Sequence, residues 1–402
     1  MKLSSLIVAL GLPALTATTT FALTGACAVA TDDPAIPADT EVVQLPSGLA
    51  YCMLASGAEG AETPAMGDLI RAHYTGWTTD GKMFDSSRNA RRPGAPVEPL
   101  TIALGDVVEG WNEGLQYCPV GGRIKLTIPS ALGYGDQGSG PIPGGATLIF
   151  DIELLEIVQR ALPHVAWPTD EAAIETSESG LAWTVLKAGE GEVIGARTAV
   201  VDFALRNEGG GFVAASPSTN VGPLVLGPTP ARFRFLTEAA QHMRAGSRVL
   251  FRVPPGLAFG DRELPNLPAG SHSLWQLEVR SLAPEFTLPS DDELTTTPSG
   301  LKYKVLREGT GKQPKASSSV NAHYTGWLTD GKKFDSSWDR GAPIDFSLTG
   351  VVAGWTEGLQ LMKEGGRILL VVPPSLGYGA RGKGSVPGNA TMVFIVDLMK
   401  TN

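Results

Sequence analysis

The most regular pattern in this sequence is a short segment in which apolar residues occupy every second position. At 150–154 Phe, Ile and Leu alternate with Asp151 and Glu153, and the same alternation returns at 275–279 and, around Asp397, at 394–398. A period of two predicts a β-strand with one face in a core and the other in solvent. Its recurrence predicts a chain built from three repeats.

Each repeat also contains one short apolar stripe with helical spacing. Its residues recur at i, i+4 and i+7, as a helix that buries a single face requires. They are Trp111, Leu115 and Cys118, then Leu236, Ala240 and Met243, and finally Trp355, Leu359 and Met362. The paired glycines Gly121-Gly122 and Gly365-Gly366 follow, and we expect them to end the helix in a positive-φ conformation.

A fifteen-residue stretch occurs twice almost unchanged, at 73–87 and 323–337. Two extended arms flank Asp80-Gly81 in the first copy and Asp330-Gly331 in the second. Asp-Gly is a typical pair for the positive-φ positions of a tight hairpin turn. The stretch therefore predicts a β-hairpin, and its duplication predicts that the first and third repeats are more alike than either is to the middle one.

The motif Ser-Gly-Leu opens each repeat, at 47–49, 179–181 and 299–301. Polar segments that contain Pro or Glu precede it and read as linkers. The predicted fold class is α+β, with three tandem domains that each wrap an antiparallel sheet around one short helix. The expected domains are 45–160, 179–283 and 299–402, and the expected linkers are 31–44, 161–178 and 284–298.

Composition and charge narrow the classes of function. Of the 402 residues 43% are hydrophobic and 18% charged, with 49 Gly and 30 Pro, as is typical of turn-rich β structure. The net charge of −9 and the lack of a basic run argue against binding to nucleic acid. No set of His, Cys or carboxylate residues has the spacing of metal ligands, so we expect no metal or other cofactor. Ser336-Ser337 has no recognisable base partner, which argues against a hydrolase triad.

The first 30 residues have the pattern of an export signal. Lys2 precedes an apolar run from Leu3 to Leu23. Two forms of processing fit the residues that follow: lipidation of Cys27, as in bacterial lipoproteins, or cleavage after Ala28 or Ala30. An uncleaved anchor is a third reading, because the run is long enough to span a bilayer. The expected location is the bacterial periplasm or its membrane, with any membrane contact made through a lipid on Cys27.

Cys52 and Cys118 are the remaining cysteines. In an exported protein they could form a disulfide within the first domain. Cys118 also belongs to the predicted core stripe of the helix, where it would serve as a small buried hydrophobe. Both interpretations stay open from the sequence.

Five motifs then occur in the same order in the first and third repeats: His-Tyr-Thr-Gly, Asp-Gly-x-x-Phe-Asp-Ser-Ser, Val-Val-x-Gly-Trp-x-Glu-Gly-Leu, Leu-Gly-Tyr-Gly and Ala-Thr-x-x-Phe. Together they resemble the FKBP-type peptidyl-prolyl cis-trans isomerases. The resemblance covers nearly all of the chain after the export signal, although the middle repeat matches only in its framework. It implies three FKBP-like domains, proline-containing polypeptides as substrates, and macrolides of the rapamycin class as inhibitors.

The resemblance also implies a pocket in each outer repeat. Its catalytic positions fall on Tyr324, Phe334, Asp335, Tyr378 and Phe394 in the third repeat and on Tyr74, Phe84, Asp85, Tyr134 and Phe150 in the first. Its substrate-binding positions fall on Trp355, Phe346, Val351, Val352, Arg340 and Val386 in the third repeat and on Trp111, Val107, Val108 and Ile142 in the first. Trp355 and Trp111 would form the pocket floors, and Arg340 would orient Asp335.

This sequence departs from the family pattern in three places. The segment Phe346–Val352 is about two residues shorter than usual, and the loop before Val386 is also short. The first repeat carries an insertion of about six residues within 88–97. The partner of Asp85 is therefore ambiguous, because Arg88, Arg91 and Arg92 all compete for the place of Arg340.

The middle repeat separates residues needed for the fold from residues needed for the pocket. It keeps the stripe and the alternating strand but has Phe203 where the third repeat has Tyr324, Phe259 for Tyr378, and Leu236 for Trp355. Val213 or Ala214 takes the place of Asp335. Because the middle repeat keeps its framework without these polar groups, we expect them to serve function in the outer repeats and the middle domain to be inactive. His73 and His323 alternate with the pocket tyrosines, so we expect them on the opposite face, in a structural role.

The leading interpretation is an exported prolyl isomerase with active first and third domains, which works without covalent chemistry by excluding water from the rotating bond. An alternative is a chaperone or binding protein that grips proline-containing segments without turnover. A surface scaffold with neither activity is the third interpretation.

Overall fold

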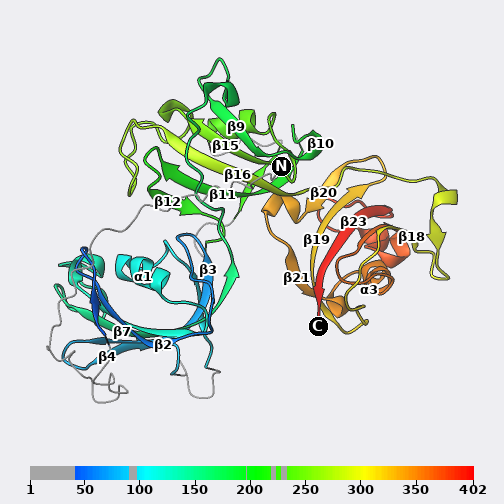
Figure 1. The fold of residues 1–402 in the computed structure, drawn as a ribbon. Helices are drawn as coiled ribbons and strands as arrows, with labels where there is room; N and C mark the ends of the chain where they lie inside the picture. Colours follow the sequence, from blue (N-terminus) through cyan, green and yellow to red (C-terminus); the bar gives the residue numbers. More distant parts are fainter. Residues whose placement is uncertain (1–40, 90–96, 196, 219–222, 228–232) are drawn as a thin grey trace, which may run out of the picture. The chain divides into compact units, whose positions relative to one another are not determined.

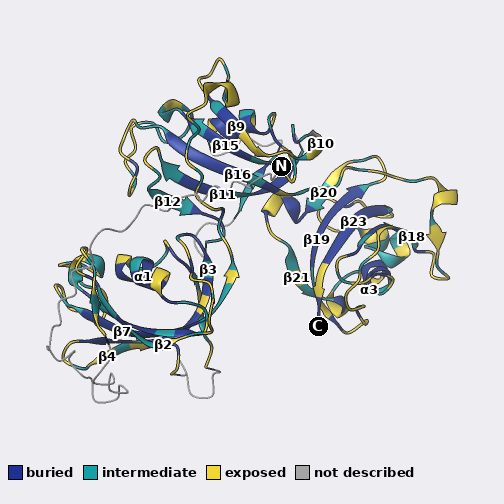
Figure 2. Ribbon diagram, viewed as in Figure 1, coloured by how far each residue is buried: buried dark blue, intermediate teal, exposed yellow. Residues whose placement is uncertain are grey.

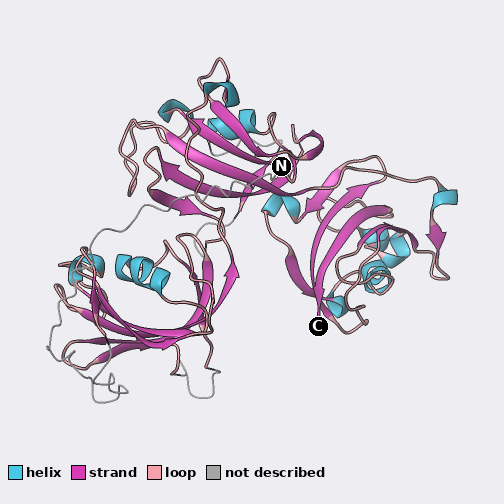
Figure 3. Ribbon diagram, in the orientation of Figure 1, coloured by secondary structure: helices cyan, strands magenta, loops and turns pink. Residues whose placement is uncertain are grey.

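The structure is a computed structural model that describes residues 41–89, 97–195, 197–218, 223–227 and 233–402. It divides after Gln159 into two compact units. The first unit holds one seven-stranded antiparallel sheet and the second holds two more, plus a two-stranded ribbon. Figure 3 shows how strongly strands predominate over helices. The predicted export signal, residues 1–30, lies outside the described residues.

The first sheet has the order β1-β2-β6-β7-β3-β4, and β5 pairs with β3 beside this path. Its strands are β1 (Val43–Gln44), β2 (Ala50–Ser56), β3 (Leu69–Thr78), β4 (Met83–Ser86), β5 (Leu100–Ala103), β6 (Gly122–Ile128) and β7 (Leu148–Gln159). The helical segments are α1 (Glu109–Gly114), η1 (Leu115–Tyr117) and η2 (Ser130–Leu132). In Figure 1 α1 lies within the curve of the sheet, where Trp111 and Leu115 join the core.

The middle sheet has the equivalent order, β12-β11-β16-β15-β9-β8, with β13 paired to β11. Its strands are β8 (Glu175–Thr176), β9 (Ala182–Lys187), β11 (Ala199–Asn207), β12 (Phe212–Ala215), β13 (Leu224–Leu226), β15 (Arg248–Val253) and β16 (Ser273–Leu282). The ribbon is β10 (Glu190–Val193) with β14 (Arg244–Ala245), and the helical segments are η3 (Glu171–Ala173), α2 (Arg234–Ala239) and η4 (Pro255–Leu257).

The third sheet repeats the order once more, β17-β18-β22-β23-β19-β20, with β21 on β19. Its strands are β17 (Thr295–Thr296), β18 (Lys302–Arg307), β19 (Ser319–Leu328), β20 (Lys333–Ser336), β21 (Ile344–Ser347), β22 (Arg367–Val372) and β23 (Met392–Thr401). The helical segments are η5 (Asp291–Glu293), η6 (Trp338–Arg340), η7 (Leu348–Gly350), α3 (Ala353–Leu359), η8 (Pro374–Leu376) and η9 (Gly379–Arg381). The α+β prediction, a sheet with one short helix in each of three bodies, is confirmed.

The predicted apolar stripes are buried in all three bodies, but the helices are shorter than the stripes. α3 ends at Leu359, so Met362 lies beyond the helix while remaining 3% exposed. Gly365 and Gly121 do have positive φ, 82° and 77°. They nevertheless lie in the turn that enters β22 and β6, so the prediction that they end the helix is wrong. Burial by the sheet, rather than helix length, keeps the stripe intact.

The hairpin prediction is confirmed, with one correction about its turn. Gly81 and Gly331 have φ of 82° and 86°, whereas their aspartate neighbours do not have positive φ. Asp330 instead accepts a hydrogen bond from the backbone N–H of Lys332 at 2.9 Å. The aspartate therefore stabilises the turn through its side chain and the glycine through its backbone.

The second and third predicted linkers, 161–178 and 284–298, pack against the sheets that follow them. Leu162 joins Ala204 and Ala215 on the outer face of the middle sheet. Phe286 and Leu294 pack on an apolar cluster on the outer face of the third sheet, formed by Trp327, Leu369, Val371, Val393 and Ile395. Figure 2 shows how deeply the central strands of that sheet are buried. Both segments thus cover apolar residues on the outer faces of the sheets.

The fold also bears on the two remaining cysteines. Cys52 and Cys118 are both free and buried, so the structure supports the buried-thiol interpretation over a disulfide. Burial raises the pKa of the Cys118 thiol to about 12. In the part of the chain that the structure describes, no helix is both long and apolar enough to cross a bilayer.

Candidate functional site

The concave side of the third sheet holds a cavity of about 370 Å³. Its wall is assembled from the four strands β19, β20, β21 and β23, the segment before α3, α3 itself and the loop that leads to β23. The lining residues are Tyr324, Phe334, Asp335, Ile344, Phe346, Gly350, Val351, Val352, Trp355, Tyr378, Lys383 and Phe394.

Aromatic rings meet edge to face at the bottom of this cavity. The centroid of the Trp355 ring lies 5.1 Å from that of Tyr324 and 5.2 Å from that of Phe394, with interplanar angles of 87° and 85°. Phe346 packs on Trp355 at 5.3 Å, and Phe334 packs on Phe394 at 5.5 Å. Edge-to-face pairs of this kind stabilise each other and fix ring orientation. The result is an apolar cup whose floor and walls are aromatic rings.

A glycine on β19 makes room for the cup. A Cβ atom on Gly326 would lie 2.7 Å from ring atoms of both Phe334 and Phe394. Gly76 has the same relation to Phe84 and Phe150 in the first body. Any larger residue would force these rings apart, because real Cβ contacts are not this short. The glycine that ends the motif His-Tyr-Thr-Gly in both outer repeats thus has a spatial reason.

A hydrogen-bonded cluster of three polar residues, Tyr324, Asp335 and Arg340, lies at the wall of this cavity. The Tyr324 hydroxyl donates a hydrogen bond to the Asp335 carboxylate, and Arg340 donates to Asp335 at 2.6 Å and to the Tyr324 oxygen at 2.9 Å. Burial and the bond to Asp335 raise the pKa of Tyr324 to about 12. Burial acts to raise the pKa of Asp335, but the hydrogen bonds from Tyr324 and Arg340 and the charge of Arg340 outweigh it and hold that pKa below its usual value. The wall therefore carries an ionised carboxylate at neutral pH.

The first body has a corresponding cavity of about 630 Å³. Its residues are Tyr74, Phe84, Asp85, Leu100, Ile102, Asp106, Val107, Val108, Trp111, Tyr134, Ser139, Gly140, Pro141, Ile142 and Phe150. Trp111 lies edge to face with Tyr74 at 5.3 Å and with Phe150 at 5.2 Å. The Tyr74 hydroxyl donates to Asp85 at 2.5 Å, so the aromatic cup and its tyrosine–aspartate pair occur twice.

Most of the predicted site residues line the two cavities. All nine predicted for the first repeat do so, and nine of eleven in the third. Of the other two, Val386 is a core residue of the third body, 5% exposed, and Arg340 donates hydrogen bonds to Asp335 and Tyr324. Of the three arginines that compete for Asp85, Arg88 pairs with Glu153 instead, and Arg91 and Arg92 lie outside the described residues.

Sequence reasoning missed several lining residues. Ile102 pairs with Ile70 on β3 as Phe346 pairs with Val320 on β19, so the two occupy the same place. A smaller side chain at this place contributes to the wider first cavity. The alternation of residues along 100–103 could have revealed Ile102, since it lies two positions before Leu104 just as Phe346 lies two before Leu348. Lys383 and Ser139 lie three residues before the predicted pocket residues Val386 and Ile142. Neither belongs to a family motif, so the resemblance could not identify them.

In the middle body, large side chains among the described residues pack together at places that correspond to lining residues of the outer cavities. Trp275, at the place of Phe394, lies 5.2 Å from Phe233 and 5.9 Å from Phe259. Leu205 replaces the glycine on the strand and pairs across β11 and β12 with Ala214, as Gly326 pairs with Asp335. Ala214, and not Val213, is therefore the counterpart of Asp335.

The histidines beside the pocket tyrosines do not line the cavities. Nδ1 of His323 lies 3.0 Å from the Ser337 hydroxyl, and its ring stacks on Trp338 at 4.0 Å. His73 has the same relation to Ser87 at 3.1 Å. Burial lowers the pKa of His323 to about 4, although Asp397 acts to raise it. His323 is thus a neutral element of the fold near pH 7. Within the described ranges, no three His, Cys, Asp or Glu side chains gather as metal ligands would.

The first and third bodies are similar in sequence to known proteins. The sequence model of the FKBP-type peptidyl-prolyl cis-trans isomerases matches residues 60–155 and 310–399. These two regions belong to that family. The matched ranges contain both cavities and leave out the middle sheet.

Individual relatives agree with the family match. The chain is 54% identical over 104 residues to the FKBP-type isomerase FkpA of Aeromonas hydrophila, an alignment that covers 26% of this chain and 39% of that protein. It is 29% identical over 350 residues to human FKBP9, covering 84% of this chain and 55% of the relative. It is also similar to the crystal structure of FkpA from Escherichia coli, with 46% identity, 28% of this chain, 53% of the other and a TM-score of 0.28. The chain thus spans between about two fifths and just over half of these relatives.

Proposed function

We propose that this chain is a peptidyl-prolyl cis-trans isomerase in which the first and third cavities each accelerate rotation about X–Pro bonds of exported proteins. The observation that carries the proposal is the repeated aromatic cup with its tyrosine–aspartate pair, set beside a middle body that has the same fold without them. The tyrosine–aspartate pair is not needed for the fold, yet it occurs in the same arrangement in both outer bodies. Family membership of these two regions supports the same activity.

The cavity suits the physics of this reaction. Rotation of an X–Pro bond meets a barrier of ~18–20 kcal/mol because the planar amide is stabilised by resonance. Water stabilises the polar planar state more than the twisted transition state. A dry aromatic cup removes that stabilisation, and each ~1.4 kcal/mol taken from the barrier raises the rate tenfold.

The residues divide this task according to their place in the cup. Trp355, Phe346 and Phe394 hold the proline ring, whereas Tyr324, Phe334 and Asp335 face the carbonyl that rotates. Tyr378 donates a hydrogen bond from the rim to the substrate backbone. Arg340 positions Asp335. No covalent intermediate or cofactor is needed.

Export is part of the proposal. The apolar run at 3–23 and the small residues around Cys27 support removal or lipidation of an export signal, and FkpA of a bacterium is among the relatives. The location proposed is the periplasm or a lipid anchor at Cys27. Mass spectrometry of the mature amino terminus tests this, because lipidated Cys27 and cleavage after Ala28 or Ala30 differ in mass.

Activity is tested on the full chain with variants that copy the middle body. Trp111→Leu with Asp85→Ala alters the first cavity, and Trp355→Leu with Asp335→Ala alters the third. The middle body carries Leu236 and Ala214 at these places, so the variants are expected to fold. Proline-limited refolding of a test protein should be accelerated by the wild type, partly by each double variant, and not by the quadruple variant.

A macrolide of the rapamycin class should inhibit the wild type by occupying the cup. If the wild type leaves the refolding rate at its spontaneous value, the catalytic proposal is wrong. Suppression of aggregation that persists in the quadruple variant would then favour a binding role as a chaperone.

A further inference from the structure

The two cavities differ in charge at one well-defined place on the rim. The third cavity is lined by Lys383, and the first has Ser139 at the same position. Lys383 is exposed, and the structure places its Nζ 5.5 Å from the centroid of the Tyr378 ring. Among the described residues no carboxylate forms an ion pair with it. An ammonium group that lies beside the cavity and touches the Tyr378 ring, with no described carboxylate paired to it, is available to an anionic group of a ligand.

The backbone around this position is the same in both bodies. Lys383 and Val386 exchange two backbone hydrogen bonds of 2.9 and 3.0 Å, and Ser139 and Ile142 exchange two of 3.0 and 2.9 Å. The preceding glycines, Gly382 and Gly138, have φ of 66° and 67°. The loops therefore present different side chains from one conformation, and exchanging these residues changes chemistry without changing the loop.

The rest of the described lining strengthens the contrast. Asp335 in the third cavity has its charge offset by Arg340, which lies 2.6 Å away. In the first cavity Asp106 occupies the place of Gly350, and Asp85 lines the same cavity. The third cavity thus adds a cation where the first has a hydroxyl, and the first adds a carboxylate where the third has a glycine.

We propose that Lys383 makes the third cavity selective for prolines that have an acidic side chain within one residue on either side, and that the first cavity lacks this preference. The inference rests on the proposed isomerase function and adds a substrate class to it. One chain would then serve two sets of prolines. The expected size is modest, because a unit charge pair ~7 Å apart in a solvated rim favours binding about threefold.

The test uses the full chain with the first cavity altered by Trp111→Leu and Asp85→Ala. Two pairs of short peptides are compared, which differ by Glu or Gln before the proline in one pair and after it in the other. Exchange between cis and trans forms is measured by NMR. At about 0.02 M salt, kcat/KM should be about threefold higher for Glu than for Gln on at least one side of the proline, and this ratio should approach 1 at about 0.5 M salt.

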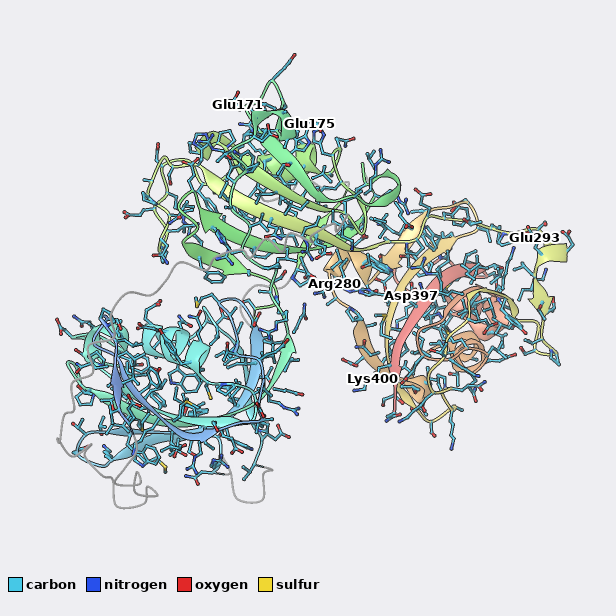
Figure 4. All side chains as sticks on the ribbon, viewed as in Figure 1. Glu171, Glu175, Arg280, Glu293, Asp397 and Lys400 are labelled. Carbon is cyan, nitrogen blue, oxygen red and sulfur yellow. The ribbon has the colours of Figure 1, made fainter. Side chains whose placement is uncertain are left out.

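Matched variants identify the residue responsible. Lys383→Ser, which copies the first cavity, should bring the ratio to about 1, whereas Lys383→Arg should retain it. Ser139→Lys should raise the ratio about threefold in a chain whose third cavity is altered instead. Lys400→Ser is the control, since Lys400, labelled on β23 in Figure 4, lines neither cavity.

The outcomes separate this inference from the proposed function. A ratio near 1 on both sides of the proline, or a raised ratio that survives Lys383→Ser, overturns the inference while turnover of the Gln peptides still supports the isomerase. If no peptide is turned over, the proposed function fails. The same peptides are then titrated against the chain by NMR, and equal affinity for Glu and Gln overturns the charge preference.

Discussion

The third and middle bodies share one framework and differ in what it encloses. Their sheets have the same strand order, and in each a serine hydroxyl accepts a hydrogen bond from the backbone N–H of the inner strand, Ser337 from Tyr324 at 2.8 Å and Ser216 from Phe203 at 2.9 Å. Around this common point one body has an aromatic cup and the other a packed cluster of rings. The comparison teaches that the fold does not depend on the cup.

A few exchanges account for the difference. Leu205 stands at the place of Gly326, where the third body admits the rings of Phe334 and Phe394. Phe233 and Trp275 add bulk at the places of Val352 and Phe394. Rings that face one another gain packing energy that open walls forgo. The open cup of the third body therefore forgoes some of the packing that the middle body has.

The largest effect is expected when the glycine beside each cup is replaced by leucine, the residue that the middle body has at position 205. Gly76→Leu together with Gly326→Leu should lower prolyl isomerase activity to the spontaneous rate, a loss of about a thousandfold or more, because each new side chain displaces two phenylalanine rings. The assay is proline-limited refolding with the full chain. Each single variant should retain the activity of the other cavity, and full activity of the double variant would show that the cups are not the site.

A second test concerns the residue just before the pocket tyrosine on the inner strand. It is His323 on β19 in the third body and Asp202 on β11 in the middle body. Because burial holds the pKa of His323 near 4, below its ordinary 6.5, the unfolded chain binds a proton between these pH values that the folded chain does not. Stability of the third body should be fully present above about pH 6.5 and should decrease as pH falls to about 4, by about 2–3 kcal/mol.

The measurement is chemical unfolding at both pH values, followed by hydrogen exchange of residues 319–328. His323→Gln should be less stable at pH 7 but should lose less stability on acidification. An NMR titration of His323 with a midpoint near 6.5 would contradict the expectation. In the middle body the corresponding residue, Asp202, is paired with Arg280 at 2.7 Å. No histidine at that position makes the stability of the middle body depend on pH in this way.

The smallest expected effect concerns the aspartate that the middle body lacks. Asp335→Ala should lower kcat/KM of the third cavity about tenfold, since Tyr324 and Arg340 lose their common acceptor. The side chain is 41% exposed, so the free energy of unfolding should change by less than about 1 kcal/mol. Peptide isomerisation and thermal unfolding of the same sample, with the first cavity altered, measure both. A large loss of stability with unchanged activity would assign Asp335 to the fold alone.

Patterns with a short period were sufficient to predict much of this molecule. Alternation along 150–154 and the stripe of Trp355 and Leu359 depend on burial of one face, and burial is what the sheet and helix impose. The pocket aromatics could be predicted because the motifs of a known family carry them. The family resemblance also implied that Arg340 orients Asp335, five residues before it, and one turn of η6 brings the arginine back to that side chain.

Other features depend on contacts that a local pattern does not record. Lys383 reaches the rim because two backbone hydrogen bonds fold its loop, and Ile102 lines a wall because of its register on β3. The helices end earlier than their stripes, since the sheet buries Met362 whether or not it is helical. The choice between Val213 and Ala214 required strand pairing, because a shift of one residue reverses which face a side chain occupies.

The two apolar residues that precede the third repeat have a practical consequence for dissecting this protein. Phe286 and Leu294 cover Trp327 and its neighbours on the back of the third sheet. A fragment cut at the Ser-Gly-Leu motif would leave that patch bare to water and prone to self-association. A soluble, excisable third domain should instead start upstream of Phe286, so the region between two repeats belongs, in folding terms, to the one that comes after it.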